Sequence, residues 1–223
     1  MTPDIHIQGI GMTSQRTRER MVKRLIQQGI SNAVILDLMR KTPRHLFIEE
    51  GFAHRAYEDV SLPIGSGQTI SQPYIVARMT ELLLESGSME QVLEIGTGCG
   101  YQTAILAPLS GKVFSIERIK PLMLGARKRL RDLRYRNVEF KFADGNEGWP
   151  SRGPFNAILS AAAPEHIPPA LLDQLAIGGR LVCPVGGGDH QELVFATKTV
   201  VGLETQAVER VNFVPFLPGT HNP

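Results

Sequence analysis

Residues 92–101, VLEIGTGCGY, restrict the possible fold more than any other stretch of this chain. An apolar strand pattern runs directly into Gly96, Gly98 and Gly100, and an apolar segment with helical spacing follows them. Glycines at a turn between a strand and a helix let a ligand approach the backbone beside the helix N-terminus. The stretch therefore predicts a ligand-binding loop in an α/β fold.

The C-terminal half continues this alternation of short apolar strands and helices. Strands are predicted at 91–95, 112–117, 138–142, 155–160 and 180–184, and helices at 101–109, 121–133 and 168–175. Such β-α-β units require right-handed crossovers and a mostly parallel sheet. Two further β-rich runs, 193–200 and 208–216, are joined through Gly202 and predict a closing antiparallel hairpin. We expect a Rossmann-like, doubly wound α/β fold.

The N-terminal half reads as a helical extension of this core. Ser14 is a candidate cap for a basic helix that ends near residue 28, and no aromatic side chains interrupt its cations, which favours a solvated face. Ser31 is expected to cap a second helix, which Pro43 ends, and a short helix follows at 44–51. The apolar face expected for the second helix consists of Val34, Ile35, Leu38 and Met39.

The expected organisation is one compact domain with loose ends. Residues 1–12 are predicted to form a flexible leader, 13–90 the N-terminal helices and a substrate loop, 91–217 the cofactor-binding core, and 218–223 a tail. Since the net charge is +2, we expect neither a nucleic-acid nor a membrane partner. The protein is also expected to be a monomer. Cys99 and Cys183 form no CxxC pair and suit the cytoplasm. Since no HxxxH pair occurs, we expect no metal.

The spacing of the glycine loop predicts which cofactor it binds. A dinucleotide loop reads GxGxxG, but this loop reads GxGxG, and Tyr101 stands where the third glycine belongs. This spacing argues against NAD and fits the loop that holds the methionine part of S-adenosylmethionine. Thr97 is part of the same loop, and Glu94, just before it, is either a partner for the methionine ammonium or a plain strand position.

Acids at the ends of the next two strands agree with that prediction. Glu117 ends the second strand, where a carboxylate can accept hydrogen bonds from both ribose hydroxyls. Asp144-Gly145 follows the third strand, where an acid can pair with the adenine amino group. Each residue alone has an ordinary explanation, a solvated strand end or a turn dipeptide. Their joint placement after successive strands makes a cofactor site the better interpretation.

Several motifs together resemble the protein-L-isoaspartate O-methyltransferase family in its bacterial, cytosolic form. They are AYED at 56–59, LPIG at 62–65, QTISQP at 68–73, the glycine loop, and later blocks at 113–118, 144–149, 161–164 and 178–186. The resemblance covers roughly residues 13–217. It implies methyl transfer from S-adenosylmethionine to the α-carboxylate of L-isoaspartyl residues, which initiates repair through a succinimide and leaves S-adenosylhomocysteine.

The resemblance also implies roles for particular residues. Ser71 corresponds to the family's active-site serine, and Thr69 and Ile70 border the transferred methyl group. Ser160 stands where members usually have threonine, and together with Ala161 it offers a small, uncharged slot for a main-chain-like substrate. Asn146 stands where bacterial members usually have tryptophan, which opens an aromatic wall near the cofactor.

The reaction explains why the stretch GSGQTISQP, residues 65–73, carries no charge. A carboxylate nucleophile is already ionised at pH 7, so the site needs no general base and must only desolvate and aim it. Neutral hydroxyl donors serve this purpose. A purely structural role is also open, since Ser71 is placed to cap a helix at 72–85.

Three other functions remain alternatives at this point. They are a different O-methyltransferase with a small carboxylate substrate, a catalytically silent cofactor-binding module, and a dinucleotide-dependent dehydrogenase, which the loop spacing makes the weakest. An assay with an isoaspartyl peptide and a normal aspartyl control separates the first alternative from the repair enzyme.

Overall fold

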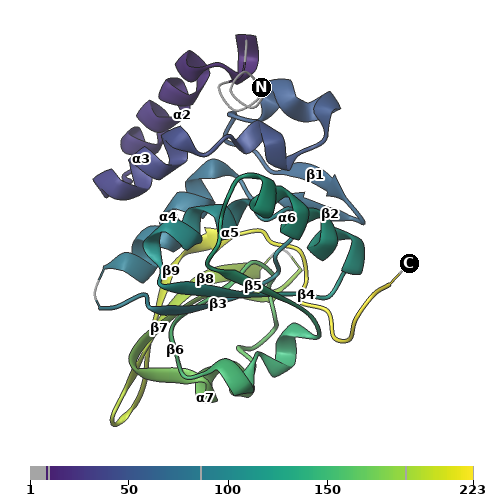
Figure 1. The fold of residues 1–223 in the computed structure, drawn as a ribbon. Helices are drawn as coiled ribbons and strands as arrows, with labels where there is room; N and C mark the ends of the chain where they lie inside the picture. Colours follow the sequence, from purple (N-terminus) through teal and green to yellow (C-terminus); the bar gives the residue numbers. More distant parts are fainter. Residues whose placement is uncertain (1–8, 10, 86, 189, 223) are drawn as a thin grey trace. The chain divides into compact units, whose positions relative to one another are not determined.

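The computed structural model describes residues 9, 11–85, 87–188 and 190–222. The chain divides into two compact units, residues 1–81 and 82–223 (Figure 1). The predicted leader at 1–12 lies largely outside the described residues, although Gly11–Thr13 form the 3-10 helix η1. The four-part domain organisation expected from the sequence stays a prediction.

The first unit is built from short helices that pack through apolar faces. α2 spans Gln15–Gln27 and buries Met21, Val22 and Leu25. α3 spans Ala33–Lys41, and the 3-10 helices η2 and η3 cover Arg44–Phe47 and Glu50–Arg55. The single short helix predicted at 44–51 is therefore two 3-10 helices.

The cations of α2 are not all solvated, which corrects the prediction from sequence. Arg18 is buried, its guanidinium lies over the ring of Tyr57 at 5.6 Å, and its Nη1 is 3.5 Å from the carbonyl of Lys41. Arg24 donates from Nη2 to the carbonyl of Tyr57 at 2.6 Å. The aromatic partner comes from a distant part of the chain, so the local sequence gave no sign of it.

The cap and the buried face of α3 also differ from the prediction. Asn32, not Ser31, caps the helix, because its Oδ1 accepts from the amides of Val34 and Ile35. The backbone N–H of Ser31 instead donates to Glu81 at 2.9 Å. Ile35, Leu36 and Met39 are the buried residues of α3, whereas Val34 is 57% exposed.

The uncharged stretch at 65–73 begins with a β-hairpin that the sequence analysis did not predict. β1, Leu62–Gly65, pairs antiparallel with β2, Gln68–Ile70. Ser66 and Gly67 form the turn with φ of 53° and 67°. Two consecutive positive φ values are the signature of a type I′ turn, whose twist matches that of the flanking strands.

The helix after this hairpin, α4, begins at Pro73 and ends at Leu84. The predicted apolar face is confirmed, since Ile75, Val76, Met79, Leu82 and Leu83 are all buried. The prediction that Ser71 caps it is wrong in position, because the Gln72 carbonyl accepts from Val76 and so occupies the capping position. The amide of Tyr74 donates to the carboxylate of Asp59 at 2.9 Å.

The second unit contains a seven-stranded sheet in the order β5-β4-β3-β6-β7-β8-β9. Strands β3 to β7 pair with one another in parallel, whereas β8 pairs antiparallel with both β7 and β9. The strands are β3 Gln91–Ile95, β4 Lys112–Glu117, β5 Val138–Phe142, β6 Phe155–Ser160, β7 Leu175–Gly187, β8 His190–Thr199 and β9 Gly202–Val211. The predicted mostly parallel α/β sheet with a terminal hairpin is confirmed.

The helices of this unit lie on both faces of the sheet, α5 and α6 on one side and α7 on the other (Figure 1). Their bounds are α5 Tyr101–Leu106, α6 Lys120–Asp132 and α7 Pro169–Asp173, with 3-10 helices η4 Ala107–Leu109, η5 Gly145–Glu147 and η6 Pro150–Arg152. The helix predicted at 168–175 is shorter, because Leu175 already belongs to β7.

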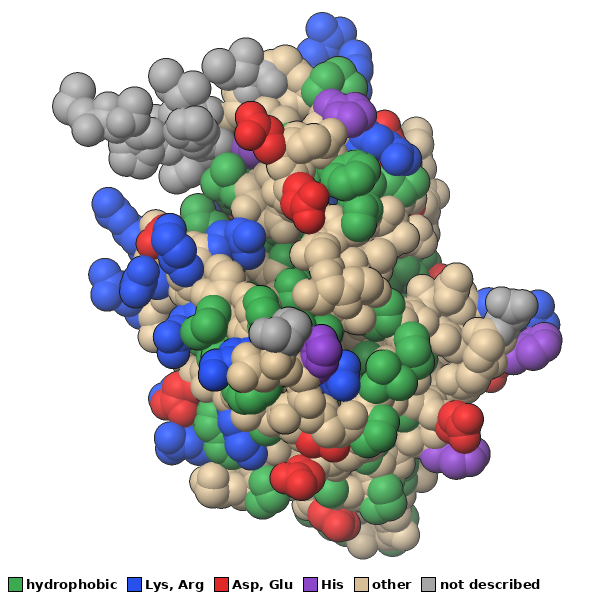
Figure 2. Space-filling view, turned by 90° about the vertical axis from the view of Figure 1, so that its right-hand side faces the viewer, with side chains coloured by type: hydrophobic (Ala, Val, Ile, Leu, Met, Phe, Trp, Pro, Cys, Tyr) green, Lys and Arg blue, Asp and Glu red, His purple; other side chains and the backbone are tan. Residues whose placement is uncertain are grey.

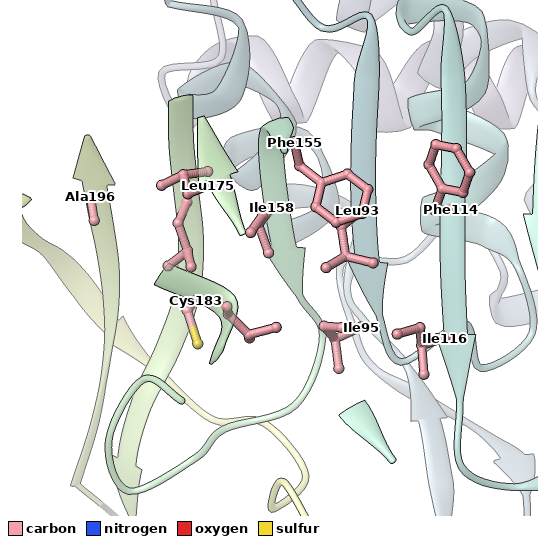
Figure 3. Packing of buried hydrophobic residues seen from close by; sticks show 11 residues of the cluster. Leu93, Ile95, Phe114, Ile116, Phe155, Ile158, Leu175, Cys183 and Ala196 are labelled. Atoms are coloured by element: carbon pink, nitrogen blue, oxygen red, sulfur yellow. The ribbon is translucent and has the colours of Figure 1, made fainter. Parts of the chain in front are cut away.

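The core on the α7 side follows the two-residue period of the strands. Leu93 and Ile95 of β3 lie in register with Phe114 and Ile116 of β4, and all four side chains point to this side (Figure 3). Phe155 packs edge-on against Phe114 with a centroid distance of 5.7 Å. The alternate positions, including Glu94, therefore face the layer that contains α5.

The terminal hairpin turns earlier than predicted. β9 begins at Gly202 and ends at Val211, whereas the second run was expected at 208–216. Val200 and Val201 form the tip and are 84% and 90% exposed.

On the face shown in Figure 2, Lys and Arg side chains gather at the left, while acidic and hydrophobic side chains are interspersed elsewhere.

Candidate cofactor and substrate site

The candidate cofactor site lies where the strand order reverses, between β3 and β6. Ligands of open parallel sheets bind outside the carboxyl ends of the strands at such a switch point. The amide of Ala161, just after β6, donates to the carbonyl of Ile95 at 2.8 Å. A Cβ on Gly96, whose φ is 88°, would lie 3.4 Å from the Cβ of Ala161. The two strand ends thus meet with little room for a side chain.

The glycine loop packs closely against α6. Gly98 and Gly100 have φ of 54° and 89°, a conformation that side chains disfavour. A Cβ on Gly100 would lie 3.2 Å from atoms of Ala126 and Leu130 on α6. Arg129, also on α6, donates from Nη1 to the carbonyl of Cys99 at 2.7 Å. The loop is therefore anchored to α6 as well as to the sheet.

Glu117 connects the loop to the end of β4. Its Oε2 accepts from the amide of Gly98 at 2.8 Å, and its Oε1 accepts from the amide of Ile119 at 2.9 Å. Burial raises the pKa of this carboxyl, although backbone hydrogen bonds from Gly98, Ile119 and Arg118 oppose the rise. A carboxylate offers about four acceptor positions, so each oxygen keeps capacity for a further donor such as a hydroxyl.

Glu94 lies on β3, just before the glycine loop, and belongs to a buried polar network. Its Oε2 accepts from the hydroxyls of Thr103, on α5, and Ser115, on β4, at 2.6 and 2.5 Å. The hydroxyl of Thr97 pairs with that of Ser115 at 2.6 Å, so the Thr97 side chain points inward. Burial raises the pKa of Glu94 to about 7.

The second oxygen of Glu94 is the unusual atom of this network. Among the described residues, Oε1 of Glu94 is buried and has no hydrogen-bond partner. Such atoms are costly and call for an explanation. A partly protonated carboxyl or a ligand cation would each satisfy it, so both interpretations of Glu94 made from the sequence stay open.

Asp144 and Gly145 follow β5, at the same carboxyl-terminal end of the parallel strands as the glycine loop. Oδ1 of Asp144 accepts from the amide and the side-chain Nδ2 of Asn146, at 2.9 and 3.0 Å. A Cβ on Gly145 would lie 2.5 Å from Ile95 and 2.9 Å from the Phe216 ring. Glycine is therefore required by close packing at this point, in addition to any role toward a ligand.

Two other predicted residues of this unit, Ser160 and Tyr101, are buried. Ser160 is 1% exposed and donates its hydroxyl to the carbonyl of Ala162 at 2.7 Å, so it already has an internal partner. Tyr101 opens α5 with a buried side chain. Their roles toward substrate and cofactor stay predictions.

The predicted substrate residues 69–71 belong to the first unit. Thr69 lies on β2 opposite Pro63 and is exposed, whereas Ile70 opposite Leu62 is buried. Ser71 follows directly and is partly buried. The hairpin gives these residues fixed register, and their roles in the reaction stay predictions.

Two features of the site were missed from the sequence. Arg129 was one cation among many in a basic segment, and only the fold brings it to the Cys99 carbonyl. The C-terminal residues were expected to be a tail, yet the amide of Gly219 donates to Oδ2 of Asp144 at 2.6 Å. Arg118 donates from Nε to the Gly219 carbonyl at 3.1 Å. No local sequence signal marks contacts of this kind.

Two classes of site are not found among the described residues. No group of three or more His, Cys, Asp or Glu side chains is placed to hold a metal ion. Within the same described ranges, no helix is long and apolar enough to cross a membrane.

A mostly parallel sheet with a glycine loop after β3 and acids at the end of β4 and after β5 is typical of Rossmann-like methyltransferases. A family model described as protein-L-isoaspartate(D-aspartate) O-methyltransferase matches residues 15–221. The chain belongs to this family, and its activity is that of a protein-L-isoaspartate O-methyltransferase. The resemblance inferred from the sequence motifs is confirmed.

Individual relatives agree over nearly the whole chain. A Pseudomonas paraeruginosa protein-L-isoaspartate O-methyltransferase is 57% identical over 208 residues, covering 93% of this chain and 99% of that protein. One from Cellvibrio japonicus is 56% identical over 217 residues, covering 96% and 97%.

Solved structures also share the fold. A protein-L-isoaspartate O-methyltransferase structure matches with a TM-score of 0.78 and 25% identity, covering 89% of this chain and 65% of that chain. A Plasmodium falciparum structure assigned to the same family, in complex with S-adenosyl-L-homocysteine, matches with a TM-score of 0.75 and 23% identity over 90% and 98%. At 23% identity, the match to the Plasmodium falciparum structure shows only that the fold is shared.

Proposed function

We propose that residues 96–100, Glu117 and Asp144 bind S-adenosylmethionine, the methyl donor of this reaction. The observation that carries the proposal is the glycine loop, which Glu117 holds through the Gly98 amide while keeping acceptor capacity of its own. Glu117 would bind the ribose hydroxyls, and Asp144 the adenine amino group. Gly96, Gly98 and Gly100 would let the methionine part approach the backbone.

The chemistry asks little of this chain beyond positioning. S-adenosylmethionine supplies a methyl group already activated on a sulfonium. The α-carboxylate of the isoaspartyl residue is ionised at neutral pH, so no side chain has to remove a proton from it. The protein must exclude water and align the carboxylate, and neutral donors do this with less loss of nucleophilicity than a nearby positive charge would cause.

Ser71 is the residue to which we assign that positioning role. It follows a hairpin of fixed register and precedes a helix whose capping position belongs to Gln72, so the capping explanation no longer accounts for its hydroxyl. Thr69 and Ile70 on β2 would border the methyl group. Ser160 and Ala161 would line the slot for the main chain of the substrate.

The test is the Ser71→Ala variant, assayed with an isoaspartyl peptide and S-adenosylmethionine. We expect kcat to fall at least about tenfold, the effect of one lost orienting hydrogen bond, with unchanged thermal stability. Ser66→Ala is the matched control, since Ser66 is an exposed serine in the turn of the same hairpin. Equal kcat values for Ser71→Ala and wild type would remove Ser71 from the mechanism.

The same assay tests the choice of substrate. The repair function requires methylation of the isoaspartyl peptide and not of its normal aspartyl counterpart. Equal methylation of both would favour the alternative, an O-methyltransferase for small carboxylates in general.

For the cellular setting we propose a cytoplasmic monomer that acts on damaged proteins, without nucleic acid or membrane as partner. Cys99 and Cys183 are free and buried, which suits a reducing compartment. Sedimentation of the purified protein tests the monomer, and fractionation of cells tests the compartment.

A further inference from the structure

The C-terminal residues 213–221, here called the C-terminal strap, run back along the carboxyl ends of the parallel strands. Beside β6, the amide of Ala163 donates to the Val214 carbonyl, and the amide of Phe216 donates to the Ala163 carbonyl, both at 2.9 Å. In Figure 1 this segment, drawn in yellow, then passes beside the end of β4. The strap therefore reaches the carboxyl ends of the strands, where the cofactor site is proposed.

Beside β4 and β5 the strap is held by four further hydrogen bonds. The amide of Gly219 reaches Asp144 at 2.6 Å, and Arg118 donates from Nε to the Gly219 carbonyl at 3.1 Å. The amide of His221 donates to the Arg118 carbonyl at 2.6 Å, and that of Lys120 to the His221 carbonyl at 3.1 Å. A loose tail would not keep this continuous pairing, so the segment is an integral part of the site.

The contact at Gly219 determines what Asp144 can still bind. An ionised carboxylate has about four acceptor positions. Asn146 fills both positions on Oδ1, and Gly219 fills one on Oδ2. Partial burial raises the pKa of Asp144, but the hydrogen bonds from Gly219 and Asn146 outweigh it, and the pKa lies below its usual value. The group stays ionised with one acceptor position left.

We infer that the C-terminal strap is a positioning element that makes the site specific for an amino-bearing purine. Gly219 fixes the rotation of the Asp144 carboxylate, and the remaining position on Oδ2 accepts from the adenine amino group. Without the strap, Asn146 alone holds the carboxylate through Oδ1, and Oδ2 is open to water instead. The inference rests on the proposed assignment of Asp144 to adenine.

The test compares S-adenosylhomocysteine with S-inosylhomocysteine, in which a carbonyl replaces the amino group. Binding of both is measured by calorimetry for the full chain, for a truncation that ends at Pro218, and for one that ends at His221. The longer truncation is the matched control because it keeps Gly219 and His221. We expect the full chain and the control to prefer S-adenosylhomocysteine by about tenfold or more, the value of one hydrogen bond to a charged group.

The truncation at Pro218 should lose most of that preference. Equal weakening of both ligands would instead make the strap a packing element, and tighter binding of S-adenosylhomocysteine would make it a competitor of the cofactor. Either result overturns the inference. A full chain without any preference overturns it together with the role of Asp144, whereas the repair activity is tested separately by the isoaspartyl assay.

A pair of full-length variants guards against misfolding of the truncated chain. Gly219 has a φ of 71° and open space around it. Gly219→Asn tolerates this φ and keeps the N–H donor, whereas Gly219→Pro removes the donor and, because proline holds φ at about −65°, also turns the strap away from Asp144. We expect the proline variant alone to lose the preference for the adenine ligand; an equal preference in both variants also overturns the inference.

Discussion

Among single residues, Glu94 is a carboxyl that the fold removes completely from water. Its carboxyl is fully buried, and two hydroxyls contact only one of its oxygens. A buried carboxyl with too few donors prefers the neutral form. Glu94 therefore links the state of the buried network to pH.

The linkage predicts a pH effect of definite sign. Burial raises the pKa of Glu94 from 4.5 to about 7 in the folded chain. Between these values the folded state binds a proton that the unfolded state has released, so the free energy of unfolding falls as pH rises from about 4.5 to about 7. The glutamine of Glu94→Gln does not titrate. The free energy of unfolding should therefore fall less steeply with rising pH in this variant, and the slopes should differ by up to the contribution of about one bound proton.

Urea unfolding at closely spaced pH values between 5 and 8 measures that slope. Glu117, whose pKa is also raised by burial, is present in both proteins, and its charge raises the pKa of Glu94, so the difference in slope includes the repulsion between the two carboxyls. Identical slopes for Glu94→Gln and wild type would mean that Glu94 is ionised throughout this range.

At the scale of elements, α6 supports the glycine loop through Arg129. The guanidinium donates to the Cys99 carbonyl, while Gly100 packs against Ala126 and Leu130 of the same helix. Arg129→Met keeps much of the aliphatic stem and removes the donor. We expect S-adenosylhomocysteine to bind about five- to tenfold more weakly by calorimetry, since one hydrogen bond of about 1 kcal/mol fixes the loop.

Arg127→Met is the control for that variant, because Arg127 lies exposed on the same helix. Similar affinities for the two variants would assign the loop's geometry to its glycines and Glu117 alone. Arg129→Lys should recover part of the affinity.

The N-terminus of α4 gives a second prediction at this scale. Asp59 accepts from the amide of Tyr74 at 2.9 Å and from the Gln28 side chain at 2.7 Å. Asp59→Ala removes a carboxylate cap and should lower the free energy of unfolding by about 1 kcal/mol in urea titrations.

Glu58→Ala serves as the comparison for Asp59→Ala. The Glu58 side chain forms an exposed ion pair with Arg55, and such pairs contribute about 0–1 kcal/mol. If both variants lose the same stability, the bond from Tyr74 contributes little to α4.

At the scale of the whole molecule, the α/β core was predictable because its signals are local. The strand beginnings at Gln91, Lys112, Val138 and Phe155 agree with the predictions to the residue. Apolar runs between turn residues mark buried parallel strands, and the glycine loop marks the first crossover. The hairpin at 62–70 was missed, because its strands are three and four residues long and Ser66 adopts a positive φ that serine seldom adopts.

The parallel sheet, the glycine loop and the acids after β4 and β5 were predictable from the sequence alone, since each depends on residues close together in the chain. The contacts that hold these acids follow from the tertiary fold. Glu117 binds Gly98 across 19 positions, and Asp144 binds Gly219 across 75 positions. Backbone amides carry no residue-specific signal, so a donor such as the Gly219 N–H becomes visible only when folding places it beside its acceptor.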